Sequence, residues 1–200
     1  MSNATGPFGL RPIRHRNGAP WNGAVVPCRI GSGYGTALYI GDPVLLATEK
    51  DYQDTIPTMM SVIQSAGTVG TIVLGAIVAF DALPANLTQI YNPASTERIA
   101  YVAMGPDVVF EIRGDGSGTW DAGWVGATAA MVNAGGSTIT GLSGFALDES
   151  TPSATQNNAL HIVGVSSRSD NEAAIYSMFE VVLNTSLNAT GDSLGVLSTT

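Results

Sequence analysis

The side chains best suited to chemistry in this 200-residue chain are two histidines and one cysteine. His15 and His161 are far apart in the sequence, and His161 lies in an apolar segment, which favours a histidine held within the fold over a catalyst. Cys28 precedes Arg29, and a neighbouring cation can lower a thiol pKa. A lone cysteine in an apolar segment is nevertheless more often a small buried hydrophobe. These residues predict no nucleophile with a general base.

Acidic side chains occur in short groups that suit acid–base chemistry or cation binding. Asp148–Glu149 and Asp170–Glu172 fall in expected turns, where solvated carboxylates are the simpler interpretation. Asp115 and Asp121 flank a glycine-rich stretch without the full ligand series of a calcium loop. The one G-x-S-x-G match, Gly191–Gly195, lies in the polar C-terminal end, and the Cys and His spacings of zinc sites are missing. The sequence therefore predicts no enzyme, no cofactor and no metal.

The clearest element of structure lies within 107–118, near the middle of the chain. Val108, Phe110 and Ile112 alternate with less apolar neighbours, and this period of two predicts a strand with one buried face. Pro106 precedes the strand and a run of glycines follows it, so both ends are sharply defined. The neighbouring segments are expected to pair with this strand or to pack against it.

The rest of the chain also predicts short strands and no long helical segment, and the whole chain is rich in glycine, with 24 residues. Met59–Ser65 fits a strand or one helical turn, and Val125–Asn133 is predicted as a short helix. The fold class is therefore all-β, a mainly antiparallel β-sandwich or barrel of about ten short strands. Further strands are expected at Ala24–Ile30, Thr36–Ile40, Val44–Thr48, Val69–Phe80, Arg98–Met104, Ile139–Leu147, Leu160–Ser166 and Ile175–Asn184.

Residues 1–23 are predicted as an extended, proline-rich arm on a domain of residues 24–184, with a polar tail at 185–200. Two interpretations of the arm remain open: it packs along its own domain, or it docks on a partner. In the second case the apolar side chains of the arm would fill grooves on the partner, and its arginines would bind carboxylates of the partner. The candidate partner-binding residues are Phe8, Leu10, Arg11, Ile13, Arg14, Arg16 and Trp21.

Charge separates the arm from the body of the chain. The first 41 residues hold four arginines and no acid, whereas residues 42–200 hold four basic residues and all 16 acids, a net charge of 4 − 16 = −12. An acidic body repels nucleic acid at long range, so no nucleic-acid partner is expected. The longest apolar run, Val69–Phe80, is too short for a membrane helix, and no secretory leader opens the chain. We therefore expect a protein made in a cytoplasm with no membrane partner.

Five segments, in order and with similar spacing, resemble the capsid decoration (cement) proteins of tailed bacteriophages. The resemblance implies a virion structural protein on the outer surface of the capsid, made in the host cytoplasm, that clamps neighbouring capsid subunits. Its implied partners are the major capsid protein and copies of itself, as a dimer or a trimer, and it implies no catalytic residues. The polar end 184–200 departs from the pattern. The segments are Gly6–His15 with Asn17–Pro20, Gly35–Val44, Asp107–Ile112, Thr140–Asp148 and Asp170–Glu172.

A carbohydrate-binding β-sandwich module is the alternative function. Trp120, Trp124 and Tyr91 would supply the aromatic platform on which a sugar stacks. The structural interpretation of the two tryptophans is that they seal the core or a subunit interface. An esterase-like enzyme is the least favoured class.

Overall fold

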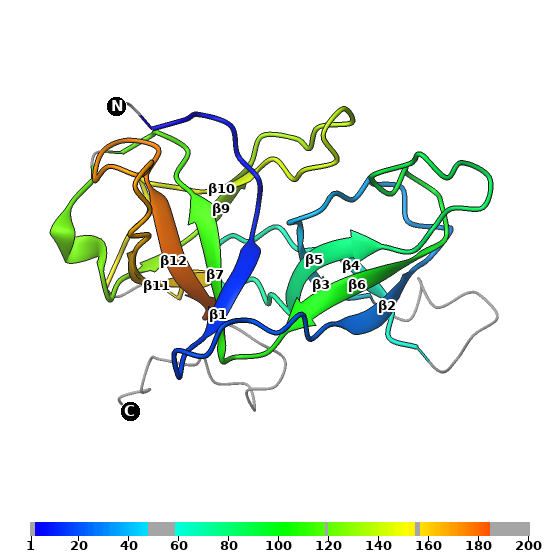
Figure 1. Ribbon diagram of the computed structural model, residues 1–200, viewed down its shortest axis with the longest axis horizontal. Coiled ribbons are helices and arrows are strands. Elements are labelled where there is room, and N and C mark those ends of the chain that lie inside the picture. Colours follow the sequence, from blue (N-terminus) through cyan, green and yellow to red (C-terminus); the bar gives the residue numbers. More distant parts are fainter. Residues whose placement is uncertain (1–2, 48–58, 119, 155–156, 185–200) are drawn as a thin grey trace.

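The computed structural model describes residues 3–47, 59–118, 120–154 and 157–184. In these ranges twelve strands form two five-stranded antiparallel sheets and one hairpin (Figure 1). The described ranges contain one helical element, a turn of 3-10 helix, η2 (Ala122–Trp124), and no helix long and apolar enough to cross a membrane. The arrangement is consistent with a β-sandwich and confirms the predicted all-β, mainly antiparallel fold.

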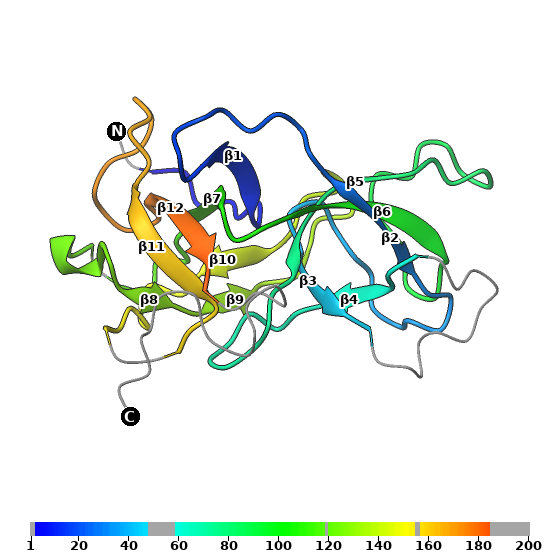
Figure 2. The same ribbon diagram turned by 90° about the horizontal axis from the view of Figure 1, so that it is seen from below.

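The first sheet has the strand order β1-β7-β12-β11-β8. It lies beside the second sheet, which has the order β2-β6-β5-β3-β4 (Figures 1 and 2). The strands of the first sheet are β1 (Arg11–His15), β7 (Val108–Arg113), β12 (Met178–Leu183), β11 (Leu160–Val165) and β8 (Thr128–Ala129). Those of the second are β2 (Val26–Ile30), β6 (Arg98–Met104), β5 (Gly75–Phe80), β3 (Pro43–Leu46) and β4 (Val62–Gln64), and the hairpin pairs β9 (Met131–Asn133) with β10 (Phe145–Leu147).

The predicted central strand is β7, which lies between β1 and β12 in the first sheet. Val108, Phe110 and Ile112 are buried together, as the alternation predicts. Val109 and Glu111 on the opposite face are buried as well, so the expectation of one buried face is wrong. Glu111 is covered there by its ion pair with Arg11 and its hydrogen bond with Ser166, and Val109 lies beside Arg14 and Arg16 of the arm.

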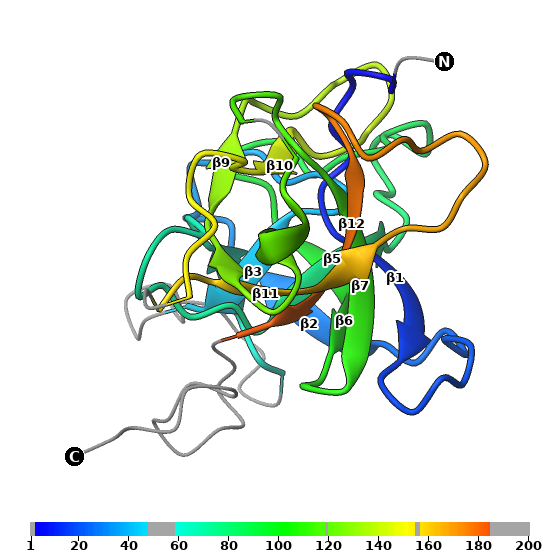
Figure 3. The same ribbon diagram turned by 90° about the vertical axis from the view of Figure 1, so that its left-hand side faces the viewer.

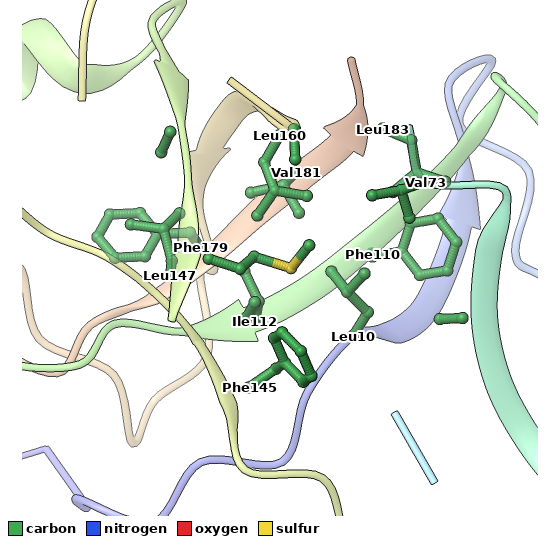
Figure 4. Close-up of a cluster of buried hydrophobic side chains, with 14 of the residues drawn as sticks. Leu10, Val73, Phe110, Ile112, Phe145, Leu147, Leu160, Phe179, Val181 and Leu183 are labelled. Carbon is green, nitrogen blue, oxygen red and sulfur yellow. The ribbon is translucent and has the colours of Figure 1, made fainter. Parts of the chain in front are cut away.

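Two clusters of buried apolar side chains form the core. The larger cluster joins the inner face of the first sheet to the hairpin, where Phe145 and Leu147 of β10 lie near Phe110, Ile112 and Phe179 (Figure 4). The smaller cluster belongs to the second sheet and includes Cys28, Ile30, Val44, Ile77 and Val102. In β12, which lies within the expected strand Ile175–Asn184, the alternate residues Phe179, Val181 and Leu183 all enter the larger cluster.

The arm contributes a strand that the sequence did not predict. β1 lies at the edge of the first sheet beside β7 (Figure 3), and Arg11 pairs with Glu111 while His15 pairs with Val108. Pro12 is tolerated because an edge strand leaves one row of amides without a ladder partner. The register shifts between Pro12 and Arg14, as at a β-bulge.

Val125–Asn133, predicted as a short helix, is instead extended and contains β8 and β9. Thr128 pairs with His161 of β11, and it also bridges Ser153. The segment is rich in alanine, which favours a helix in isolation. Its small side chains are nevertheless buried at 127, 129 and 130, so sheet pairing and core packing determine its conformation.

Other predicted strands are present but shorter. Val69–Phe80 forms a strand only from Gly75, and Ile139–Leu147 only from Phe145. Ile175–Asn184 forms a strand from Met178, because the backbone of Tyr176 is left-handed (φ +61°) and interrupts the extended chain. Met59–Ser65, left open between strand and helix, contains β4.

Candidate partner-binding surfaces

The apolar residues of the arm pack mainly on the chain's own domain. Leu10 is 1% exposed and belongs to the larger core cluster, and Trp21 packs against the same cluster. The Phe8 ring lies under the guanidinium groups of Arg11 and Arg113, at 4.8 and 5.4 Å from its centroid. Of the two interpretations of the arm, the structure fits the one in which it completes its own sheet.

The arginines of the arm neutralise two carboxylates on the outer face of the first sheet. Glu111 and Glu180 are direct neighbours on β7 and β12, a like-charge pairing that is unfavourable alone. Arg11 forms an ion pair with Glu111, and Arg14 forms one with Glu180 at 2.5 Å. Glu111, which is buried, also accepts a 2.7 Å hydrogen bond from the Ser166 hydroxyl. Two of the three arginines of the arm are therefore engaged within the fold.

Arg16 is exposed and, among the described residues, takes part in no ion pair. It lines a pocket of about 320 Å³ together with Arg14, Val109 and His161. Burial lowers the pKa of His161, and the nearby Arg16 lowers it further, which favours the neutral imidazole. The pocket thus combines Arg16, a cation without an ion-pair partner among the described residues, with Arg14, His161 and apolar side chains, and it suits a single carboxylate.

Four of the segments that carry the sequence resemblance meet in space. The amide of Gly9 donates to the carbonyl of Phe145 at 3.1 Å, and that of Leu10 donates to Gly41 at 2.9 Å. The amide of Ser143 donates to Ile40 at 2.8 Å, and the pairing of β1 with β7 brings in the central strand. These segments form one hydrogen-bonded junction between the two sheets.

Asp42 stabilises the junction from within. It is 1% exposed, and its carboxylate accepts hydrogen bonds from the Tyr39 amide at 3.0 Å and from the Gln64 side chain at 2.8 Å. Burial raises its pKa, whereas the hydrogen bonds, including one from Ser143, act in the opposite direction. The Gly-Asp-Pro turn of the sequence is therefore a buried structural site.

A second surface consists of loops 31–41, 82–96 and 134–144, which together contain no charged side chain. We call their exposed parts the uncharged loop face. Thr36–Ile40, predicted as a strand, forms only isolated bridges, from Leu38 to Asn92 and from Ile40 to Leu142, and these hold the three loops together. In Figure 1 the second and third of these loops project from the upper edge of the molecule.

The uncharged loop face carries the most exposed large apolar side chains of the described residues. Ile139 is 88% exposed and Leu87 is 79% exposed, with Ile90 and Leu142 beside them at 43% and 38%. No sequence motif marks this surface. The available signal was the absence of charge from three stretches of an acidic chain, but only the fold shows that they converge.

The aromatic residues of the alternative function do not form a shared platform. Trp120 and Trp124 meet edge to face at 77°, and both lie against the buried Phe179 ring. Tyr91 instead stacks on Tyr39, with ring centroids 5.1 Å apart. In Figure 1, η2 and the loop between β5 and β6 lie at opposite ends of the molecule. The tryptophans therefore seal the outer side of the larger core cluster.

Glu149, expected in a solvated turn, is 2% exposed. Its carboxylate lies against the glycine-rich loop after β7: a Cβ at Gly114 would clash with the carboxylate, and one at Gly118 with the backbone of Glu149. Neither oxygen has a hydrogen-bond partner of good geometry, and burial raises its pKa. The nearby Asp115 accepts hydrogen bonds from Ser117 and from the amide of Glu149, so its role here is to shape the loop.

The described residues contain no group of three or more His, Cys, Asp or Glu side chains placed to hold a metal ion. Cys28 is fully buried, and burial raises the pKa of its thiol to about 11, which makes it a poor nucleophile at neutral pH. Asp121 caps η2 by accepting a 2.7 Å hydrogen bond from the Gly123 amide, apart from the Asp115 cluster.

No protein-family model, curated protein or solved structure matches this chain. A functional assignment therefore rests on the sequence resemblance and on the surfaces described above.

Proposed function

We propose that the chain is a capsid decoration (cement) protein of a tailed phage, which binds the outside of the head and stabilises contacts between capsid subunits. The observation that carries this proposal is the convergence of the resembling segments. Gly6–His15, Gly35–Val44, Asp107–Ile112 and Thr140–Asp148 are dispersed in the sequence but share one junction. Chance matches to turns have no reason to meet in space, whereas segments that define a common fold do.

The proposed contact with the major capsid protein is the outer face of the first sheet, where the arm lies. Ile13, Arg14 and Arg16 remain at least partly accessible there, whereas Leu10 is buried in the core. Arg16 offers a guanidinium without a competing carboxylate and adjoins the pocket with Arg14 and His161. A carboxylate of a capsid subunit matches this chemistry, because arginine binds carboxylates in a planar, bidentate manner.

The experiment is co-sedimentation of the purified protein with undecorated heads of the phage that encodes it. We expect saturable binding of the full chain. Arg16→Gln should weaken binding by up to about fivefold, because an exposed ion pair contributes about 0–1 kcal/mol. A matched control is Val69→Asp, which also lowers the net charge by one and lies in a loop of the other sheet, where Val69 is 56% exposed.

Full-length protein that stays folded but does not sediment with heads would contradict the proposed function. If Arg16→Gln and Val69→Asp bind as the unaltered protein does, the function stands but Arg16 is not part of the contact. A glycan array tests the alternative function, a carbohydrate-binding module, because such a module requires a glycan ligand and a decoration protein does not.

A further inference from the structure

The uncharged loop face has the composition of a contact surface. Leu87 and Ile139 project from two different loops, and each exposes more than three quarters of its side chain. Large apolar side chains exposed on one connected set of loops are typical of interaction sites. The nearest charged residues in the sequence, Asp81 and Glu97, lie directly outside the loop 82–96.

The loop face is held in shape before any partner binds. Arg98, at the start of β6, is 8% exposed and donates to three backbone carbonyls of the β5–β6 connection. The distances are 2.6 Å to Asp81, 2.8 Å to Tyr91 and 3.0 Å to Gln89. The stacking of Tyr39 on Tyr91, with an interplanar angle of 15°, ties this loop to 31–41. A surface ordered in advance loses less entropy on association.

Charge determines which partner suits this face. The chain has a net charge of −8, so two copies repel each other wherever their acidic surfaces meet. Contact through the loop face brings no charged side chain of its three loops against another. The polar side chains on it are hydroxyls and amides, such as Thr88, Gln89 and Ser137. These groups both donate and accept hydrogen bonds, so an identical surface can satisfy them.

We propose that the uncharged loop face binds the same face of a second copy of the chain. A symmetric contact of this type places Leu87 and Ile139 of each copy against apolar groups of the other. It also leaves the η2 end of the first sheet free, because η2 and the β5–β6 loop lie at opposite ends of the molecule (Figures 1 and 2). The inference goes beyond capsid binding and is tested without heads.

Sedimentation velocity of the full chain over about 1–100 µM is the experiment. We expect the unaltered protein to associate and the double variant Leu87→Ser/Ile139→Ser to associate at least about tenfold more weakly. The matched control is Val69→Ser/Ile72→Ser, which removes two apolar side chains that are 56% and 47% exposed in another loop. The dissociation constant of this control should lie within about twofold of that of the unaltered protein. Circular dichroism establishes that both variants keep the β fold.

Salt provides an independent measurement. Raising sodium chloride from about 0.05 to 0.5 M screens the repulsion between two acidic copies, so association through an uncharged face should strengthen. A contact based on the arginines of the arm would weaken under the same change.

A protein that is monomeric at all these concentrations overturns the inference, as does a control variant that loses association equally. Association that weakens steeply with salt also overturns it. A monomeric protein that still sediments with heads would refute this inference and leave the proposed function standing. The reverse result, a dimer that ignores heads, would refute only the function.

Discussion

Leu10 and Gly41 are joined by a 2.9 Å backbone hydrogen bond that fastens the N-terminal arm to the turn before β3. The bond requires a close approach of two backbones, since Gly9 and Gly41 face each other beside it. A Cβ on either glycine would collide with backbone atoms of the other segment. Both glycines also have positive φ, +74° and +95°. The junction between the two sheets therefore depends on residues without side chains.

Gly9→Ala should destabilise the protein by about 2–4 kcal/mol, because it combines an unfavourable backbone conformation with a clash against unyielding backbone atoms. The free energy of unfolding in urea is the measurement. Two controls separate the causes. Gly18→Ala, at φ +88° in open space, should cost only about 1–2 kcal/mol, and Gly6→Ala, with neither constraint, less than about 0.5 kcal/mol. Equal effects at all three positions would contradict the close approach.

The buried Glu149 should make the free energy of unfolding depend on pH. Burial raises its folded-state pKa above the ordinary 4.5, so folding takes up a proton between these two values. The stabilising contribution of this group is fully present below pH 4.5 and is lost as the pH rises through the raised pKa. Glu149→Gln removes the titration. The stability of this variant relative to the unaltered protein should therefore increase as the pH rises from 4.5 through the raised pKa of Glu149.

Urea unfolding of both proteins at several pH values tests this expectation. A difference in unfolding free energy that stays constant across the range would mean that the Glu149 carboxylate does not titrate in a buried environment.

Cys28 should resist thiol reagents in the folded protein. It is fully buried, and with a pKa of about 11 only about one thiol in a thousand is ionised at pH 8. Modification by a chromogenic disulfide should therefore be at least about a hundredfold slower in the native protein than in guanidinium chloride. Cys28 is the chain's only cysteine, which makes the signal unambiguous. Comparable rates in both states would place the thiol at the surface.

The sequence predicted the strands whose side chains alternate clearly. The alternation of Val108, Phe110 and Ile112 identified β7, because alternate side chains on a strand point to opposite faces. The strand expected at Ile175–Asn184 contains β12. β1 was missed, since five residues that include Pro12 give no such pattern, and their pairing with β7 is a tertiary contact. The Ala-rich 127–130 segment was misjudged for a related reason, because burial overrode its local preference for a helix.

The candidate surfaces were predictable only in part. The arm was identified by its arginines, but nothing in the sequence shows that Glu111 and Glu180 would neutralise two of them. Glu149 was expected to be solvated, because an Asp-Glu pair is typical of a turn, whereas the glycine loop after β7 encloses its carboxylate. The uncharged loop face depends on three loops meeting, and local sequence carries no information on that convergence.

Deleting residues 1–21 decides between the two interpretations of the arm. The structure predicts that truncation damages the domain, because it removes β1 from β7 and Leu10 from the larger core cluster. The truncated chain should lose at least about 3 kcal/mol of stability or fail to fold, since a buried leucine alone contributes about 2–5 kcal/mol. Leu10→Ala is the comparison, because it opens the cavity but keeps the strand and the arginines. The truncation should therefore be the more damaging of the two.

A truncated protein with the circular dichroism and urea midpoint of the full chain would instead show that the arm is separable. The arm would then be free to act as a docking element, and the pairing of β1 with β7 would contribute nothing to the stability of the fold.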